Sequence, residues 1–265
     1  MGRLEGKAAL VCGAGQSPGE TIGNGRAMAL LFAREGARVL CVDRVGERAQ
    51  ETAAMIEGEG GSAAWLAADI SQASGAQAAV EEALDKLGGL DVLVNNVGIG
   101  GGDGPAHLVE EKAFDRILTV NLKGAWLTSK AAIPVMREAG GGAIVNISSL
   151  ASIAGGNQVA YEVSKAAMNR LTTSVAQANA KYGVRCNAVL PGLMDTPMAV
   201  DGIARATGQT PQAVRDARSA RVPLGGQMGT AWDTAYAALF LACDESRFVT
   251  GVLLPVDGGM SSRIG

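Results

Sequence analysis

The stretch VCGAGQSPGETIGNGRAMALLFAREGARVLCVD, residues 11–43, decides the fold. It leads from the end of an apolar run through a glycine-rich turn into an amphipathic segment, and closes with a second apolar run at Asp43. A strand, a turn whose glycines admit a phosphate, a helix start and an acidic residue about 20 positions on form a βαβ unit that binds a dinucleotide. We therefore predict that Gly13, Gly23 and Gly25 let the backbone approach a pyrophosphate.

The segment 15–19, Gly-Gln-Ser-Pro-Gly, also fits the nucleophile elbow of a serine hydrolase. That elbow takes an oxyanion donor from the backbone N–H of the residue after the serine, and here the residue is Pro18, which has no N–H. It also needs a histidine base, and the only histidine, His107, lies in a Gly/Pro-rich connection with no feature that places it near Ser17. The phosphate-loop interpretation is therefore favoured.

Short apolar runs alternate with longer stretches of helical periodicity along the rest of the chain. The apolar runs begin at Lys7, Ala37, Ser62, Asp91, Ala143, Gly183 and Gly251. Residues 26–34, 72–87 and 161–182 are among the stretches with helical periodicity. This alternation calls for parallel strands with helical crossovers, and the nearly continuous apolar strands indicate a sheet covered on both faces. We predict one α/β domain over residues 1–265, a doubly wound Rossmann fold with a single parallel sheet.

Composition narrows the function classes. The 265 residues are 48% hydrophobic with a net charge of -3 and dispersed lysines and arginines, so we expect neither nucleic acid nor a membrane as partner. The first strand starts too early for a signal peptide and no apolar run reaches the roughly 20 residues of a membrane span, so a cytoplasmic location is expected. Cysteines far apart without a CxxC pair indicate buried reduced thiols and no metal site: Cys12, Cys41, Cys186 and Cys243.

Residues 196–229 break the alternation. Here helical pieces are interrupted by prolines and glycines, and we interpret this long insertion beside the strand ends as a lid over a substrate site. Four arginines lie in or beside it: Arg205, Arg215, Arg218 and Arg221. They fit either a carboxylate or acidic carrier-protein ligand or, as we favour, a charged helix face paired with Asp201 and Asp216.

Asp43 sets the cofactor expectation. A carboxylate at the end of the second strand accepts hydrogen bonds from a ribose 2′-hydroxyl and repels a 2′-phosphate, so NAD is expected rather than NADP. Arg44 is the reservation, because an adjacent guanidinium can bind a 2′-phosphate; the alternative for Arg44 is a solvated surface position.

Tyr161 and Lys165 lie one helical turn apart on the same face of the expected helix 161–182. A neighbouring cation favours the phenolate and lowers the pKa of a tyrosine, so Tyr161 can exchange a proton with a hydroxyl or carbonyl. Residues 146–149, Asn-Ile-Ser-Ser, end a strand at the carboxyl edge of the sheet, where ligands bind. Other polar motifs are Asn95 to Gly98 after a strand, Asn121 in a predicted helix, and Asp69-Ile70 after a strand.

In this order the motifs resemble the short-chain dehydrogenase/reductase family over nearly all of the chain. The resemblance implies a doubly wound sheet of about seven parallel strands, a homodimer or homotetramer, and an oxidoreductase that moves a hydride between nicotinamide and an alcohol or carbonyl carbon. It implies that Tyr161 is the general acid/base, and that Lys165 lowers its pKa and holds the nicotinamide ribose. Ser149 then orients the substrate oxygen, and Asn121 anchors a proton-relay water near Lys165.

The resemblance also implies the cofactor contacts. Asp69 and Ile70 match adenine contacts, and the run PGLMDTPM from Pro191 matches the loop on the nicotinamide side. The VDGG run at 256–259 matches a structural C-terminal signature. The expected cofactor-binding residues are Gly13, Ser17, Gly23, Asn24, Gly25, Asp43, Arg44, Asp69, Ile70, Asn96, Gly98, Tyr161, Lys165, Pro191, Gly192, Met194 and Thr196.

Two departures from the family pattern leave alternatives open. The glycine loop is expanded by residues 16–21, QSPGET, so the amides that touch the pyrophosphate are undetermined and Ser17 is either a contact or solvated. One residue fewer than usual separates the strand-end serines from Tyr161, so counting back from the tyrosine selects Ser148. Matching from the strand selects Ser149, which we prefer because the following loop can absorb a deletion.

We expect a mostly apolar pocket for a secondary alcohol or ketone of modest size. The expected substrate contacts are Ser149, Ile153, Val159, Tyr161, Met194 and Met198. One alternative is a 3-oxoacyl-carrier-protein reductase. Such an enzyme would use NADPH, whereas Asp43 indicates NAD. Another is a non-catalytic NAD-binding regulator on the same fold, which the intact serine, tyrosine and lysine disfavour. Helix 161–182 is rich in Ala, Ser and Thr on more than one face, which suits packing against a second subunit.

Overall fold

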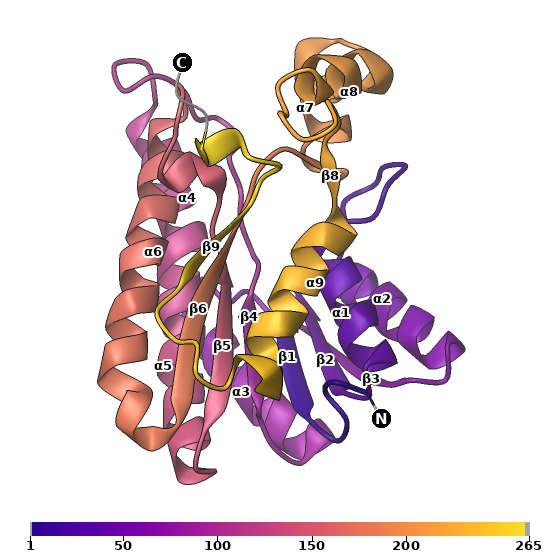
Figure 1. The fold of residues 1–265 in the computed structure, drawn as a ribbon, viewed down its shortest axis with the longest axis vertical. Helices are drawn as coiled ribbons and strands as arrows, with labels where there is room; N and C mark the ends of the chain where they lie inside the picture. The colour runs from indigo at the N-terminus through magenta and orange to yellow at the C-terminus, as the bar shows by residue number, and fades with distance from the viewer. Residues whose placement is uncertain (1, 263–265) are drawn as a thin grey trace.

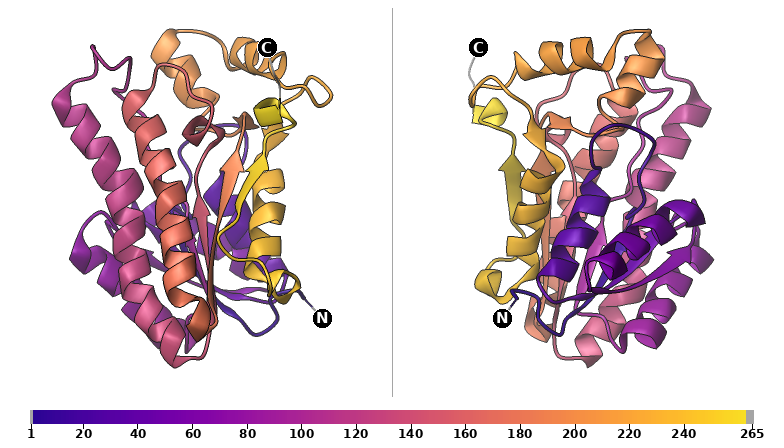
Figure 2. Two further views of the ribbon diagram at one scale, coloured as in Figure 1. Left: turned by 60° about the vertical axis from the view of Figure 1, so that its left-hand side comes forward. Right: turned by 90° about the vertical axis from the view of Figure 1, so that its right-hand side faces the viewer.

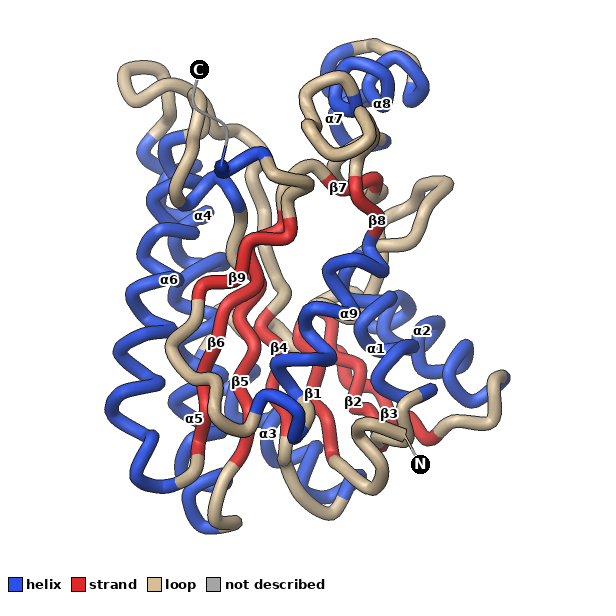
Figure 3. The backbone as a smooth tube through the Cα atoms, viewed as in Figure 1, coloured by secondary structure: helices blue, strands red, loops and turns tan. Residues whose placement is uncertain are grey.

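The computed structural model describes residues 2–262 and places a seven-stranded parallel sheet at the centre of the chain (Figures 1 and 3). The strands lie in the order β3-β2-β1-β4-β5-β6-β9. Their bounds are β1 Ala8–Cys12, β2 Arg38–Asp43, β3 Ser62–Ala67, β4 Val92–Asn95, β5 Gly142–Ile147, β6 Val184–Pro191 and β9 Leu253–Val256. Each of the seven apolar runs forms one of these strands, so the predicted doubly wound α/β fold is confirmed.

Helices cover both faces of the sheet (Figures 1 and 2). On one face lie α1 Asn24–Arg34, α2 Gly46–Gly58 and α9 Ala231–Ala242. On the other lie α3 Ala73–Leu87, α4 Glu111–Leu118, α5 Gly124–Glu138 and α6 Val159–Asn179. Strand β1 shows why this works: Ala9 and Val11 face the core under α1 and α9, whereas Ala8, Leu10 and Cys12 face the core under α3 and α5.

Three local features differ from the prediction. Strands β3 and β9 are at the sheet edges and are partly open, with Trp65 of β3 43% exposed, so the expected burial on both faces is wrong there. Helix α1 begins at Asn24, two residues before Arg26. Asn121 lies in a π-helical turn, Thr119–Lys123, which joins α4 to α5.

All four cysteines are buried and unpaired, as predicted. Within residues 2–262, no helix is long and apolar enough to cross a membrane. The same residues contain no group of three or more His, Cys, Asp or Glu side chains placed to hold a metal ion.

The segment 196–229, which we call the lid segment, extends beyond the carboxyl ends of the strands (Figure 2). It contains α7 Asp201–Thr207 and α8 Pro211–Ser219 and is anchored by a two-stranded sheet of β7 Met194–Asp195 and β8 Gly229–Thr230. The long loop between β1 and α1 reaches up toward α7 and α8 from below. The cofactor loop and the lid segment predicted from the sequence therefore meet at the same edge of the sheet.

Candidate active site

The four predicted catalytic side chains gather at the carboxyl edge of the sheet, from three different segments. Tyr161 and Lys165 come from α6, Ser149 follows β5, and Asn121 comes from the π-helical turn. The Lys165 Nζ atom lies 5.7 Å from the centre of the Tyr161 ring and donates a hydrogen bond to the Ile147 carbonyl at 2.7 Å. The same-face arrangement predicted from the spacing is therefore present.

Burial dominates the electrostatics of this pair. Lys165 is only 2% exposed, and burial lowers the pKa of its ammonium group from 10.5 to about 8. Burial also raises the pKa of Tyr161, and a hydrogen bond with the Ser149 side chain opposes that rise. The net direction for Tyr161 is opposite to the one expected from its spacing to a cation, because burial penalises the phenolate.

The two candidate serines have different partners. Ser148 is buried and its hydroxyl donates to the Lys165 carbonyl on α6 at 3.1 Å. Ser149 caps a short 3-10 turn, accepting from the Ala151 N–H at 3.1 Å, and lies near enough to the Tyr161 side chain to oppose the rise in the pKa of the tyrosine. The geometry thus brings Ser149, and not Ser148, to the tyrosine hydroxyl.

Asn121 is held firmly by its neighbours. Its Oδ1 accepts from the Ile99 N–H at 2.8 Å, and its Nδ2 donates to the Ile99 carbonyl at 2.9 Å and to the Ser164 hydroxyl at 3.0 Å. The π-helical turn points the side chain inward, which is a frequent use of such turns at functional sites. Gly98 lies beside it, and a Cβ added there would stand 3.2 Å from Lys165 Nζ. Asn121 therefore ties the loop after β4 to α6 beneath Lys165.

The glycine turn after β1 is built for close approach. Gly13 has a φ of +82°, which favours glycine, and its carbonyl accepts from Asn96 Nδ2 at 2.9 Å. A side chain at Gly25 would collide with the Gly13 carbonyl. At the start of α1, the amide Oδ1 of Asn24 is buried and has no hydrogen-bond partner among the described residues. The orphaned atom is an acceptor, so it fits a donor on an absent ligand, such as a ribose hydroxyl, whereas the backbone N–H groups at the start of α1 suit a pyrophosphate.

The expanded part of the loop has an internal support that the sequence analysis missed. Gln16 accepts from the Gly23 N–H at 2.8 Å through Oε1 and donates to the Thr21 carbonyl at 3.1 Å through Nε2. Ser17 makes no such bond and is half-buried. The place of Gln16 at one end of the insertion could have indicated this role, because its side-chain amide carries both a donor and an acceptor and can bond to the other end of the loop.

Asp43 lies where the chain turns back past the glycine loop. Its Oδ1 accepts from the Val45 N–H at 2.9 Å, and a Cβ at Gly15 would stand 2.6 Å from its Oδ2. Arg44 is exposed, whereas Arg48, which the sequence analysis did not select, has its Cβ against Gly15. One carboxylate oxygen of Asp43 thus remains available to a ribose beside Gly15.

The other expected cofactor residues lie near the carboxyl edge of the sheet, and their hydrogen bonds and burial differ. Asp69 caps the turn before α3 by accepting from the Ser71 N–H at 3.0 Å, and Ile70 is buried against Gly124. Pro191 is the last residue of β6, and Gly192 passes close to the Asp257 backbone. Met194 and Thr196 are buried at the base of the lid segment, at 5% and 6% exposed.

The expected substrate contacts fall into two groups. Ser149, Tyr161 and Val159, the first residue of α6, lie around the start of that helix. Ile153 and Met198 are each 56% exposed, so they offer apolar surface at the rim of the site. Met194, in contrast, is buried.

The lid segment is tied to the expanded glycine loop. Arg215 on α8 forms ion pairs with Glu20 at 2.9 Å and with Asp195 at 3.1 Å, and the Thr21 hydroxyl donates to Asp195 at 3.5 Å. Arg205 on α7 donates to the Pro18 carbonyl at 3.5 Å.

The expected pairing of the lid arginines with Asp201 and Asp216 is wrong. Asp216 accepts instead from Gln212 at 2.7 Å, and Oδ2 of Asp201 has no partner among the described residues. Arg215 bypasses Asp216 because adjacent residues of a helix point in different directions.

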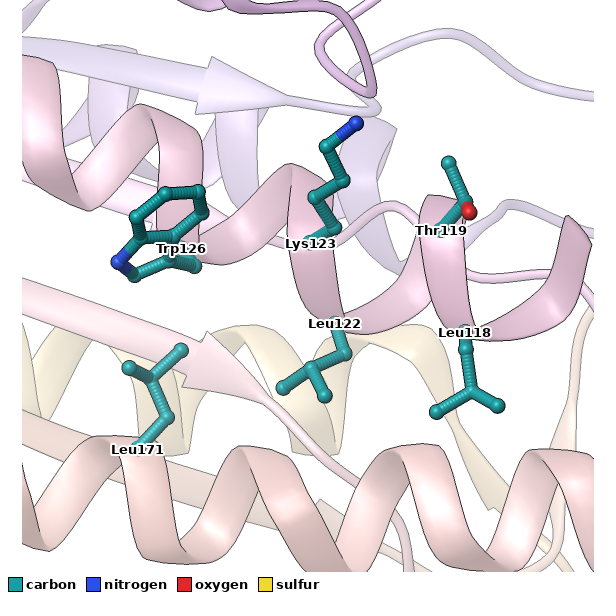
Figure 4. A pocket seen from close by; sticks show the side chains of 6 residues that line it. All are labelled: Leu118, Thr119, Leu122, Lys123, Trp126 and Leu171. Atoms are coloured by element: carbon teal, nitrogen blue, oxygen red, sulfur yellow. The ribbon is translucent and has the colours of Figure 1, made fainter. Parts of the chain in front are cut away.

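A separate hollow of about 400 Å³ lies between the α4–α5 region and α6 (Figure 4). Leu118 and Leu122 point toward α6, and Leu171 of α6 points back toward them. The lining residues are Leu118, Thr119, Leu122, Lys123, Trp126 and Leu171. None of these residues belongs to the catalytic set, so this hollow is not the expected substrate pocket.

Comparison with known proteins agrees with this geometry. Residues 20–261 match a family model described as Enoyl-(Acyl carrier protein) reductase, which belongs to the short-chain dehydrogenases. The chain belongs to the short-chain dehydrogenase/reductase family. It is therefore an oxidoreductase of this family that acts on substrates of the alcohol or ketone type.

Within the family, the chain is similar to the following three proteins, among others. A 7alpha-hydroxysteroid dehydrogenase of Clostridium sardiniense is 38% identical, covering 98% of this chain and 95% of that protein. A 3-oxoacyl-[acyl-carrier-protein] reductase, FabG, of Thermotoga maritima is 36% identical, covering 97% of this chain and 99% of that protein. The structure of carveol dehydrogenase from Mycobacterium avium in complex with NAD aligns with a TM-score of 0.91 and 30% identity, covering 99% of this chain and 100% of the other.

Proposed function

We propose that this protein is an NAD-dependent dehydrogenase that interconverts a ring-borne secondary alcohol and its ketone. The observation that carries the proposal is the placement of Tyr161 and the buried Lys165 on one face of α6, with Ser149 at the end of β5 near the tyrosine side chain. Two hydroxyl groups that meet at the carboxyl edge can both bond to one substrate oxygen. The alcohols named for the hydroxysteroid and carveol relatives are carried on rings, which supports the ring-borne class.

In the oxidation direction, Ser149 and Tyr161 hold the alcohol oxygen. The Tyr161 phenolate takes the hydroxyl proton as the C=O bond forms. A bound nicotinamide would supply the acceptor for the hydride that leaves the same carbon. The Lys165 ammonium, once close to a phenolate, stabilises its negative charge. Asn121 keeps the loop after β4 and α6 together around this proton transfer. In reduction the same groups act in reverse, with Tyr161 donating the proton.

NAD is proposed rather than NADP because of Asp43. Its Oδ2 stands beside Gly15 and suits the 2′-hydroxyl of a ribose, whereas a 2′-phosphate there would face a carboxylate. The remaining cofactor contacts proposed are those expected from the sequence, with the pyrophosphate at the backbone of Gly13, Asn24 and Gly25. Because Arg215 is engaged with Glu20 and Asp195, this arginine gives the carrier-protein alternative no additional support.

The test is nicotinamide absorbance with NAD or NADP and cyclohexanol, and with NADH or NADPH and cyclohexanone. We expect turnover with a kcat/KM for NAD at least about tenfold above that for NADP, which corresponds to about 1.4 kcal/mol of repulsion between Asp43 and a 2′-phosphate. Tyr161→Phe is expected to abolish turnover while NADH binding, followed by fluorescence, persists. Tyr182→Phe, just beyond the same helix, is the matched control and should remain active.

Each alternative has its own outcome in this experiment. A preference for NADPH with oxoacyl thioesters would support the carrier-protein reductase and contradict the role given to Asp43. Cofactor binding without turnover on any alcohol would support a regulator. Full activity of Tyr161→Phe would contradict the proposed proton transfer.

We further propose that a second copy of the chain packs on α5 and α6, forming a homodimer or a homotetramer. The hollow of Figure 4 is mostly apolar, Trp126 in its lining is 45% exposed, and Val163 on α6 is 44% exposed. Trp126→Glu is expected to reduce the mass measured by light scattering, and an unchanged mass would contradict this interface.

A further inference from the structure

The carboxylate of Asp103 caps the first turn of α6, the helix that carries Tyr161. Its Oδ2 accepts a hydrogen bond from the backbone N–H of Tyr161 at 2.7 Å. Its Oδ1 accepts from the Ala160 N–H at 3.1 Å and from the Gly104 N–H at 2.8 Å. We propose that Asp103 is a positioning residue, which fixes the tyrosine hydroxyl relative to Ser149 by holding the backbone of Tyr161.

The start of α6 depends on this residue because the first N–H groups of a helix have no partner within the helix. The residue before the helix, Gln158, makes no side-chain cap. The loop after β4 supplies the missing acceptors: the Gly104 carbonyl bonds the Val159 N–H at 3.2 Å, and Asp103 bonds the next two. The first turn of the catalytic helix is thus attached to a loop more than 50 residues away in sequence.

The loop itself is held at its other end. Ile99 exchanges two hydrogen bonds with Asn121, so the segment 99–104 runs from Asn121 to the N-terminus of α6. Ser149, in contrast, is placed by the end of β5. A shift of the segment 99–104 would therefore move Tyr161 relative to Ser149, and displacement of a catalytic group by about 1 Å can cost about 100-fold in rate.

Both oxygens of Asp103 accept hydrogen bonds, which makes an amide a poor replacement. Asparagine has one acceptor oxygen, so Asp103→Asn would place an NH2 group against at least one backbone N–H. Glu162 offers a matched control on the same turn, because only its Oε1 accepts, from the Gly156 N–H at 2.6 Å and the Gln158 N–H at 3.0 Å. Glu162→Gln keeps that oxygen and removes one negative charge from the same region.

The test rests on the proposed function and compares Asp103→Asn with Glu162→Gln in the full-length protein, with NAD and cyclohexanol. Asp103→Asn is expected to lower kcat by about 10- to 100-fold with the KM for NAD changed by less than about threefold, because only the tyrosine is displaced. Glu162→Gln is expected to keep kcat within about threefold of the wild type. Equal losses in the two variants, or an unchanged kcat in Asp103→Asn, would overturn the proposal.

Hydrogen exchange followed by mass spectrometry supplies a readout that needs no turnover. Asp103→Asn is expected to exchange faster in the first turn of α6 and at the wild-type rate in β5, and unchanged exchange in α6 would overturn the proposal. Asp103→Glu keeps two acceptor oxygens and should retain more kcat than Asp103→Asn; the reverse order would also overturn it. If Tyr161→Phe were as active as the wild type, the proposed function would be refuted. Hydrogen exchange would still show whether Asp103 caps α6.

Discussion

Lys165 is predicted to destabilise the fold that it serves. Its folded-state pKa of about 8 lies below the ordinary 10.5, so at neutral pH the folded protein keeps a charged ammonium that burial disfavours. By proton linkage this difference corresponds to about 3 kcal/mol of stability lost at pH 7. Lys165→Met removes the charge and keeps the length of the side chain, but it leaves the Ile147 carbonyl without its donor, at a cost of about 1 kcal/mol.

The net expectation is a variant about 2 kcal/mol more stable than the wild type at pH 7 and without dehydrogenase activity. The sign reverses the usual effect of a lost contact, because the unfolded wild type binds more protons than the folded one between about pH 8 and 10.5. In that window the stability contributed by Lys165 rises with pH, so the advantage of the variant should shrink by about 2 kcal/mol by about pH 9.5.

Urea unfolding at matched protein concentration and several pH values measures this difference. Only the difference between variant and wild type is informative, because three buried thiols, Cys12, Cys41 and Cys186, have pKa values raised to about 12 and make both proteins less stable above about pH 9. Tyr161 adds to that loss only above its ordinary pKa. A difference that stays constant from pH 7 upward, or a variant less stable at pH 7, would refute the reasoning.

Two further substitutions test the surroundings of the pair. Ser149→Ala is expected to lower kcat by about 100-fold, because it removes a donor to the reacting oxygen. Ser148→Ala loses a bond to the α6 backbone, so it should lower the free energy of unfolding by about 1 kcal/mol and keep more activity. Steady-state kinetics and urea unfolding of both variants check this, and equal losses of kcat would contradict it. Arg215→Met should raise the KM for NAD by about threefold to tenfold with little change in kcat, since Glu20 and Asp195 lose their shared partner; an unchanged KM would show that the glycine loop does not depend on the lid segment.

The sheet could be predicted because its signals are local. A strand buried on both faces reads as an apolar run, and β1 distributes its five residues between the two cores. The exceptions are β3 and β9, which are only partly buried because they lie at the two edges of the sheet. Strand order is a property of the whole chain, so no local pattern in residues 62–67 or 253–256 gives these places.

The site could be predicted only where its residues share one element. Tyr161 and Lys165 are four residues apart on one helix, so their common face follows from helix geometry. The pKa values of Tyr161 and Lys165 do not follow from helix geometry. They depend on burial, and β5 and the loop after β4, which contribute to that burial, are distant in sequence. The ion pairs of Arg215 were missed for the same reason: Glu20 lies at the opposite end of the sequence, and the nearby acid Asp216 points elsewhere.

The buried polar residues beneath the site explain how such distant segments are kept in register. Asn95 and Asn146 are directly opposite on β4 and β5, and their side chains are joined by a hydrogen bond of 2.9 Å. Thr128 of α5 donates to Asn95 at 2.6 Å, and Asn146 donates to Thr172 of α6 at 2.9 Å. A one-residue slip between the strands would leave these buried groups unpaired, which is far more costly than a slip between apolar side chains. The network therefore fixes the ends of β4 and β5 against each other, and with them the two loops that carry Asp103 and Ser149 to Tyr161.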